Sequence, residues 1–149
     1  MKNKFGFILV KPQMGENIGS SARSLKNFNF SNLTIVNPKQ GWPDSKTKAT
    51  SVGAYNIIKK AKICSNVIDA VSQFDIVFSL SSRRRDINKK HISINNFLKI
   101  ISTNKNLKYG LMFGPEASGL SNEDLSFSNY ILQIPTHKNF KSMNLSHSL

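Results

Sequence analysis

The stretch F-G-F-I-L-V at Phe5–Val10 is followed directly by Lys11 and Pro12. It is a continuous apolar run without alternating polar residues, which predicts a strand buried on both faces of a sheet and ended by the proline. Strands buried on both faces are typical of parallel sheets. We therefore expect a parallel sheet at the centre of the fold.

The same succession of strand, loop and helix recurs along the rest of the chain. Asn17 is a plausible N-cap, and apolar residues recur at helical spacing from Ile18 to Phe28. Further strands are predicted at Leu33–Val36, 76–80, Tyr109–Phe113 and 130–134, and further helices at 50–61, 67–73, 94–102, Asn122–Ser126 and from 144 onward. This alternation predicts an α/β fold, with a mostly parallel sheet and helices on both faces.

Length and charge limit the kind of protein. The chain has 149 residues, 39% of them hydrophobic, which is enough for one domain with a core and too little for two ordinary ones, so we predict a single domain over residues 1–149. Lys and Arg number 21 against 8 Asp and Glu, which gives a formal net charge of +13. That charge favours a polyanionic partner such as nucleic acid, although a generally basic composition would give the same count.

Cysteine usage and the N-terminal segment concern the compartment. Cys64 is the single cysteine, so no internal disulfide can form and a reducing compartment fits. The apolar run near the N-terminus is too short for a signal peptide or a membrane span. We expect a cytoplasmic protein that does not associate with membranes. The three histidines show no ligand spacing with Cys or acidic residues, so no metal site is predicted.

The loop after the predicted strand 76–80 is polar and basic. Leu80 is followed by Ser81 and Ser82, and then by Arg83, Arg84 and Arg85. The carboxyl ends of strands are where open α/β sheets bind ligands. The arginines would suit RNA phosphates there, although such a run is also common in a merely solvated loop.

A second candidate loop, G-P-E-A-S-G, follows the predicted strand Tyr109–Phe113. Gly114 and Gly119 would let the backbone approach a ligand closely, or they serve only as turn glycines. Leu120 follows Gly119 where a phosphate-binding loop has lysine, and G-x-G-x-x-G is absent, so neither ATP nor NAD is indicated. Glu116 lies in the loop and is a candidate site residue, whereas Glu123 fits helix capping.

The segment N-I-G-S-S-A-R ends in Arg23. The small residues Ser20, Ser21 and Ala22 precede it and would let another chain approach closely. A guanidinium at this place can clamp a phosphate or a carboxylate with two hydrogen bonds. The alternative is a solvated arginine on a helix.

Three segments in order resemble the motifs of a known family. N-I-G-S-S-A-R, F-G-P-E-A-S-G-L-S-N-E-D-L, and I-P followed by S-M-N-L-S resemble those of the SPOUT superfamily of RNA methyltransferases, specifically its SpoU (TrmH/TrmJ-type) 2'-O-methyltransferases. The resemblance covers nearly the whole chain, and L-T-I-V-N-P and S-V-G-A resemble the TrmJ-like branch. It implies a C-terminal trefoil knot and a homodimer whose site is completed across subunits. Because such proteins continue beyond the point where this chain stops, a truncated C-terminal helix is expected.

The resemblance also implies the chemistry. The expected cofactor is S-adenosylmethionine, and the expected reaction is methyl transfer to a ribose 2'-hydroxyl in the anticodon loop of tRNA. Arg23 takes the position of the catalytic arginine, with Asn17 and Glu116 in supporting roles. The implied cofactor-binding residues are Leu80, Ser81, Ser82, Gly114, Ile134, Ser142, Met143 and Asn144. The candidate RNA-binding residues are Arg23, Arg83, Arg84, Arg85, Lys138 and Lys141.

Arginine is a poor general base because its pKa lies above about 12. We therefore expect Arg23 to hold the substrate phosphate and to orient the hydroxyl, which leaves the proton acceptor unassigned. Two alternatives stay open at this stage. One is a basic RNA-binding protein without catalysis, or an inactive truncated methyltransferase, and the other is an enzyme that acts on ribosomal RNA.

Overall fold

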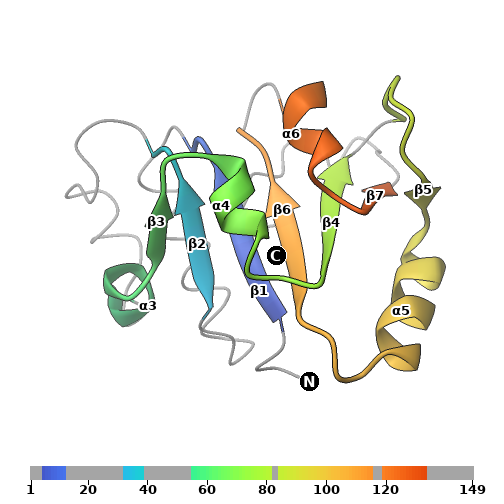
Figure 1. Ribbon diagram of the computed structural model, residues 1–149, viewed down its shortest axis with the longest axis horizontal. Helices are drawn as coiled ribbons and strands as arrows, with labels where there is room; N and C mark the ends of the chain where they lie inside the picture. The colour runs from blue at the N-terminus through green and yellow to red at the C-terminus, as the bar shows by residue number, and fades with distance from the viewer. Residues whose placement is uncertain (1–4, 13–31, 39–54, 82–83, 116–118, 134–149) are drawn as a thin grey trace.

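The computed structural model describes residues 5–12, 32–38, 55–81, 84–115 and 119–133. These residues form a seven-stranded sheet in the order β3-β2-β1-β6-β4-β7-β5, and neighbouring strands are parallel throughout (Figure 1). The strands are β1 (Phe5–Val10), β2 (Leu33–Val36), β3 (Lys62–Cys64), β4 (Ile76–Ser81), β5 (His91–Ile92), β6 (Tyr109–Phe113) and β7 (Tyr130–Gln133). The helices are α3 (Tyr55–Lys59), α4 (Val67–Val71), α5 (Ile94–Thr103) and α6 (Asn122–Ser126).

The expected parallel sheet is confirmed, and every strand predicted within the described residues is present. The helices predicted at 67–73 and 94–102 correspond to α4 and α5, and α3 is the described part of the one predicted at 50–61. Two strands were not predicted, β3 and β5, which have three and two residues. The helices predicted from Ile18 and from Asn144 lie outside the described residues.

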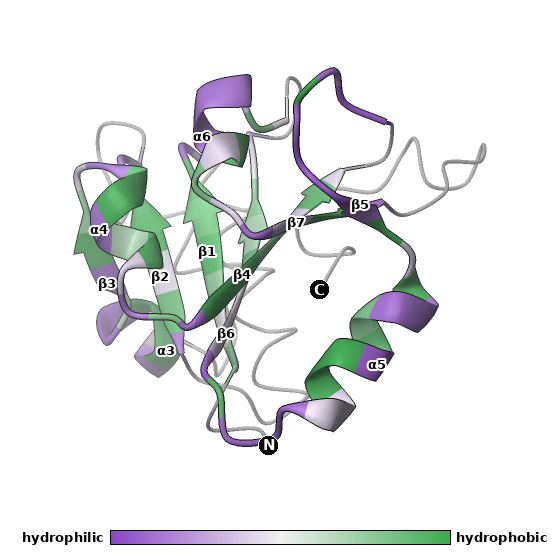
Figure 2. Cartoon of the chain, turned by 45° about the vertical axis from the view of Figure 1, so that its right-hand side comes forward, coloured by the Kyte–Doolittle hydropathy of each residue, from purple (hydrophilic) through white to green (hydrophobic). Residues whose placement is uncertain are grey.

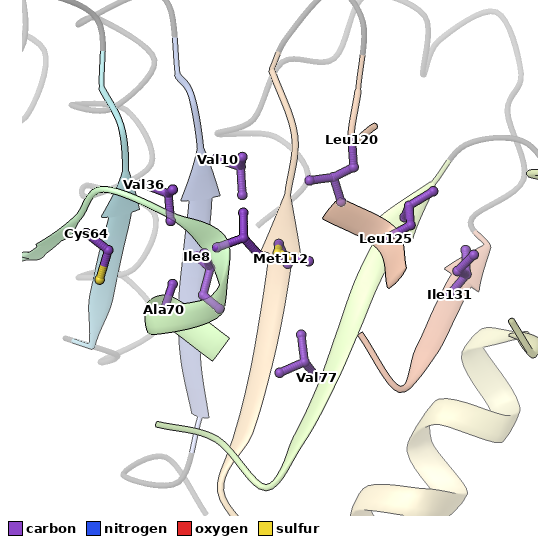
Figure 3. Packing of buried hydrophobic residues seen from close by; sticks show 11 residues of the cluster. Ile8, Val10, Val36, Cys64, Ala70, Val77, Met112, Leu120, Leu125 and Ile131 are labelled. Atoms are coloured by element: carbon purple, nitrogen blue, oxygen red, sulfur yellow. The ribbon is translucent and has the colours of Figure 1, made fainter. Parts of the chain in front are cut away.

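Side chains of β1 point alternately to the two faces of the sheet, and each face is covered by helices. Phe7 and Leu9 pack in one cluster with residues of α3, and Phe5 belongs to a cluster that includes Ile101 of α5. Ile8 packs on the opposite face with residues of α4 and α6 (Figure 3). Ile8 and Leu9 are both fully buried, and each such side chain contributes about 1.5–3 kcal/mol through burial. The prediction of helices on both faces is therefore confirmed.

Three of the described helices, α4, α5 and α6, begin at local capping residues. The side chains of Asn66, Ser93 and Ser121 accept hydrogen bonds from the backbone N–H of the third helical residue of α4, α5 and α6, at 2.8, 3.2 and 3.1 Å. These caps satisfy backbone donors that have no partner within the helix. Ser121 itself caps α6, and Glu123 lies in its first turn, where a carboxylate favours the helix dipole.

The order of the strands brings late segments of the chain into the middle of the sheet. The chain runs outward from β1 through β2 to β3, and β6 later pairs with both β1 and β4. Similarly, β7 lies between β4 and β5, which are consecutive in the sequence. Because all strands are parallel, the carboxyl ends of β6, β4 and β7 lie side by side at one edge (Figure 1).

Candidate functional site

Three of the predicted cofactor-binding positions lie at this carboxyl edge. Leu80 and Ser81 end β4, where they are paired with Leu132 and Gln133 of β7. On the other side of β4 the last paired residues are Ser79 and Met112, and Gly114 lies two residues further along the chain from Met112. Leu80 is half-buried and Ser81 is buried. The fold therefore brings together segments that are more than thirty residues apart in the sequence.

Gly114 and Gly119 belong to a segment that folds back on itself. We call it the glycine loop and define it by Gly114, Pro115, Gly119 and Leu120. The Gly119 N–H donates to the Pro115 carbonyl oxygen at 2.9 Å, and Gly119 has a φ of +70°, a conformation that favours glycine. A Cβ atom on Gly114 would lie 2.3 Å from the Leu120 nitrogen. The close backbone approach predicted at Gly114 is thus made to the chain's own backbone.

Leu120 anchors the end of the glycine loop in the core. Its side chain is 1% exposed and packs in the same cluster as Leu125 of α6 and Met112 of β6 (Figure 3). The loop therefore leaves β6 and returns to the face of the sheet that α4 and α6 cover. This arrangement fixes the direction in which the chain leaves the carboxyl edge.

The basic segment between β4 and β5 contributes a contact to the glycine loop. The Arg85 guanidinium donates from Nη2 to the Leu120 carbonyl oxygen at 2.6 Å, and its Nη1 lies 3.8 Å from the position of a Cβ built on Gly119. Arg85 is half-buried, whereas its neighbour Arg84 is exposed. Figure 2 shows this segment as mostly hydrophilic. Arg84 and Arg85 are adjacent in the same run of arginines, yet their side chains have different surroundings.

A histidine holds the backbone of Arg85. The Arg85 N–H donates to His91 Nε2 at 3.0 Å, and His91 Nδ1 lies 3.1 Å from the Lys89 carbonyl oxygen. Because Nε2 accepts a hydrogen bond, the ring proton belongs on Nδ1, which then donates to Lys89. The sequence did not predict a role for His91 or Leu120. No spacing in the sequence indicates these contacts.

The remaining predicted site residues lie outside the described residues. They are Asn17, Arg23, Ser82, Arg83, Glu116, Ile134, Lys138, Lys141, Ser142, Met143 and Asn144. Gln133, the last residue of β7, directly precedes Ile134 in the sequence and ends at the same edge as Ser81. The catalytic roles inferred for Arg23, Asn17 and Glu116 stay predictions.

Two further observations concern metal binding and membrane spans in the described ranges. Within them, no three His, Cys, Asp or Glu residues are grouped so that they could hold a metal ion. Nor does any helix among these residues have the length and apolar character needed to cross a membrane.

A parallel sheet with late strands inserted beside β4, and with glycine-containing and basic loops at one edge, agrees with one class of RNA-modifying proteins. The chain belongs to the SpoU rRNA Methylase family, whose model matches residues 4–149. The family expected from the three sequence motifs is therefore confirmed.

Particular relatives belong to the TrmJ type. The tRNA (cytidine-2'-O-)-methyltransferase TrmJ of Methanocaldococcus jannaschii is 34% identical over 95% of this chain, and the tRNA (cytidine/uridine-2'-O-)-methyltransferase TrmJ of Sodalis glossinidius is 32% identical over 98%. The crystal structure of TrmJ from Z. mobilis superposes with a TM-score of 0.86 at 31% identity, covering 96% of this chain and 64% of that one. The chain spans 62% and 57% of the lengths of the first two relatives.

Proposed function

We propose that this chain is an S-adenosylmethionine-dependent methyltransferase that modifies a ribose 2'-hydroxyl of tRNA. The observation that carries the proposal is the family match over residues 4–149. It is supported by a fold in which Leu80, Ser81 and Gly114 lie at one edge of the sheet. The TrmJ relatives, named for 2'-O-methylation of tRNA, support tRNA as the substrate. The resemblance to the TrmJ-like branch favours a nucleotide of the anticodon loop.

The described residues at the edge fit the proposed cofactor. Leu80 offers apolar surface beside two core clusters, while Ser81 and Gly114 present backbone groups at the ends of neighbouring strands. Apolar surface with a few backbone donors and acceptors is what binds an adenosine group at this edge of an open α/β sheet. The cofactor supplies, when bound, an activated methyl group on a sulfonium sulfur. The residues proposed to hold it are Leu80, Ser81, Ser82, Gly114, Ile134, Ser142, Met143 and Asn144.

Arg23 is proposed to hold the phosphate next to the target ribose and to orient the 2'-hydroxyl, with Asn17 and Glu116 supporting it. Positioning of this kind is effective, since aligning two reactants can account for about 7–11 kcal/mol of a barrier. The net charge of +13 suits a phosphate-rich substrate. Arg83, Arg84, Lys138 and Lys141 are the proposed RNA contacts in addition to Arg23.

The topology and the assembly are also part of the proposal. The insertion of β7 between β4 and β5, which are connected directly in the chain, supports a trefoil knot formed by the C-terminal part. We further propose a homodimer in which the small residues Ser20, Ser21 and Ala22 let a second copy approach the first motif. The proposed location is the cytoplasm.

The test measures cofactor binding first and methyl transfer second. Calorimetric titration with S-adenosylhomocysteine is expected to give saturable binding to one site per chain. Radiolabelled S-adenosylmethionine should then transfer its label to tRNA, and Arg23→Ala should lower that rate by about 100-fold, the effect of misplacing a reacting group. Cofactor affinity should stay near wild type in this variant, and Arg23→Lys serves as the charge-preserving control.

Two results would redirect the assignment. Binding of RNA that weakens steeply with salt, in a folded protein that does not bind S-adenosylhomocysteine, would favour the non-catalytic RNA-binding alternative. Label transfer to ribosomal RNA in preference to tRNA would favour the alternative that the enzyme acts on ribosomal RNA, the substrate for which the family is named. Unchanged methyl transfer in Arg23→Ala would reject the catalytic role of that residue.

A further inference from the structure

We propose that Arg85 is a positioning residue, which holds the glycine loop in the shape that cofactor binding needs, and that His91 holds Arg85 in turn. The inference rests on the proposed function, because it assigns the glycine loop to the cofactor site. It changes the role expected for one residue of the arginine run. Arg84 keeps its place as an RNA contact, whereas the guanidinium of Arg85 acts within the protein.

The contact between Arg85 and the glycine loop has the features of a structural tie. The donor is charged and the Nη2 to oxygen distance of 2.6 Å is short. Hydrogen bonds with a charged donor are about twice as strong as neutral ones. The acceptor is the carbonyl of Leu120, whose buried side chain already fixes the residue in the core. The guanidinium also lies beside Gly119, since its Nη1 is 3.8 Å from the position of a Cβ atom built on that residue.

Arg85 is placed so that it contacts several segments at the carboxyl edge. Arg85 lies four residues after Ser81 in the segment that leaves β4, and it reaches the loop that follows β6. Its backbone N–H is held by His91 of β5, and β5 pairs with β7 at Ile131. Arg85 therefore connects the segments that follow β4 and β6 with the pair β5–β7. These segments carry the proposed cofactor residues Ser81 and Gly114.

The competing view is that Arg85 binds RNA phosphate as its neighbour does. Arg84 provides a matched control, because it is adjacent, carries the same charge and is exposed. A phosphate contact should respond to loss of charge through RNA affinity and leave cofactor affinity unchanged. A positioning residue should respond through cofactor affinity, and a variant that keeps a donor should recover part of it.

The experiment compares Arg85→Ala, Arg85→Lys and Arg84→Ala in the full chain by titration with S-adenosylhomocysteine. Arg85→Ala is expected to bind at least about tenfold more weakly than wild type, because a charge-assisted hydrogen bond is lost. Arg85→Lys should lie between the two, and Arg84→Ala should stay within about twofold of wild type while losing tRNA affinity. During turnover, Arg85→Ala should raise the KM for S-adenosylmethionine more than the KM for tRNA. Wild-type cofactor affinity in Arg85→Ala would overturn the proposal.

Hydrogen exchange tests the same tie without any cofactor. The Gly119 N–H is bonded to Pro115 within the loop, so its exchange reports whether the loop stays closed. Arg85→Ala and His91→Ala should exchange this amide faster than wild type, and Arg84→Ala should not. Equal exchange in all four proteins would overturn the proposal. If wild type fails to bind S-adenosylhomocysteine, the proposed function fails, and the exchange measurement still decides whether Arg85 holds the loop.

Discussion

The sheet has an amino edge, where its strands begin, and a carboxyl edge, where they end, and the chain segments at these two edges are held by different contacts. At the amino edge, backbone groups and aromatic rings form a dense set of contacts. The Asp75 N–H donates to the Lys108 carbonyl at 2.8 Å, and the Lys108 N–H donates to Asp75 Oδ2 at 2.8 Å. The Asn129 side chain accepts a hydrogen bond from the Val77 N–H at 2.8 Å, and its own N–H donates to the Val77 carbonyl.

At the carboxyl edge, the described loops are connected through individual side chains. Arg85 joins the glycine loop, and His91 holds the backbone of Arg85. This difference indicates that the contacts at the amino edge stabilise the fold, whereas the carboxyl edge carries the segments proposed to bind the cofactor. Substitutions at the two edges should therefore separate into effects on unfolding and effects on binding.

The largest effect is expected at the aromatic cluster on the amino side. Phe78 is fully buried and its ring lies 4.7 Å from that of Phe97, measured between centroids, and 5.6 Å from that of Tyr130. Phe78→Ala should lower the free energy of unfolding by about 3–5 kcal/mol, because it removes a buried ring and leaves a cavity. Urea unfolding measures this, with Phe78→Leu as the smaller change. A loss of less than about 1 kcal/mol would contradict the view that contacts on the amino side dominate the stability of the fold.

Two glycine substitutions in and beside β6 test whether the two edges respond differently. Gly110 lies in β6, where an added Cβ would meet the ring of Phe74 at 2.8 Å, and Gly114 lies just beyond the same strand, where it would meet the Leu120 backbone at 2.3 Å. Gly110→Ala should cost about 1–3 kcal/mol of stability through overpacking. Its affinity for S-adenosylhomocysteine should remain that of wild type.

Gly114→Ala should act mainly on binding, because the glycine loop must open to make room for the methyl group. We expect affinity for S-adenosylhomocysteine to fall by about tenfold or more, equivalent to 1.4 kcal/mol. Calorimetry at a temperature where both variants are folded separates the outcomes. Equal affinities in the two variants would remove the distinction between the edges.

The sequence predicted the long central strands because their apolar runs leave few alternatives. β1 and β6 are buried along nearly their whole length, and their residues alternate between two helix-covered faces. β3 could not be found, because Lys62 and Ile63 are exposed and three residues are too few to show a period. β5 has only two residues and exists through its pairing with β7.

The site was predictable where it depends on strand ends. Leu80 and Ser81 end β4 and Gly114 follows β6, and the sequence predicted both strands. The resemblance assigned these residues to a cofactor. The difference between Arg84 and Arg85 was not predictable, since the Leu120 carbonyl that Arg85 meets is 35 residues away in the chain. Such contacts depend on strand order, and strand order is decided by which buried faces pack together rather than by any local pattern.

Alkaline pH should cause a smaller loss of stability, through Tyr109 at the amino edge. Burial raises the pKa of Tyr109 above its ordinary value of 10.0, and the nearby Asp75 charge raises it further. The unfolded chain therefore ionises this phenol first, so the stabilising contribution is complete below pH 10 and is lost as the pH rises through the folded-state pKa. Tyr109→Phe should lack this part of the alkaline loss. The check is the free energy of unfolding from about pH 8 to pH 11, where lysines and other tyrosines titrate equally in both proteins.

The smallest effect is expected midway between the edges. Ser79 is fully buried in β4, and among the described residues its hydroxyl oxygen has no hydrogen-bond partner. Burying a hydroxyl without a partner costs about 1–3 kcal/mol, and Ser79→Ala removes that cost together with one small group. Stability should therefore stay equal to wild type or rise by up to about 1 kcal/mol, as measured by thermal and urea unfolding. Ser128→Ala is the matched control, because that buried hydroxyl donates to the Leu125 carbonyl at 2.7 Å and its removal should destabilise. A clear destabilisation by Ser79→Ala would contradict this prediction, because it would mean that the hydroxyl has a hydrogen-bond partner in the folded protein.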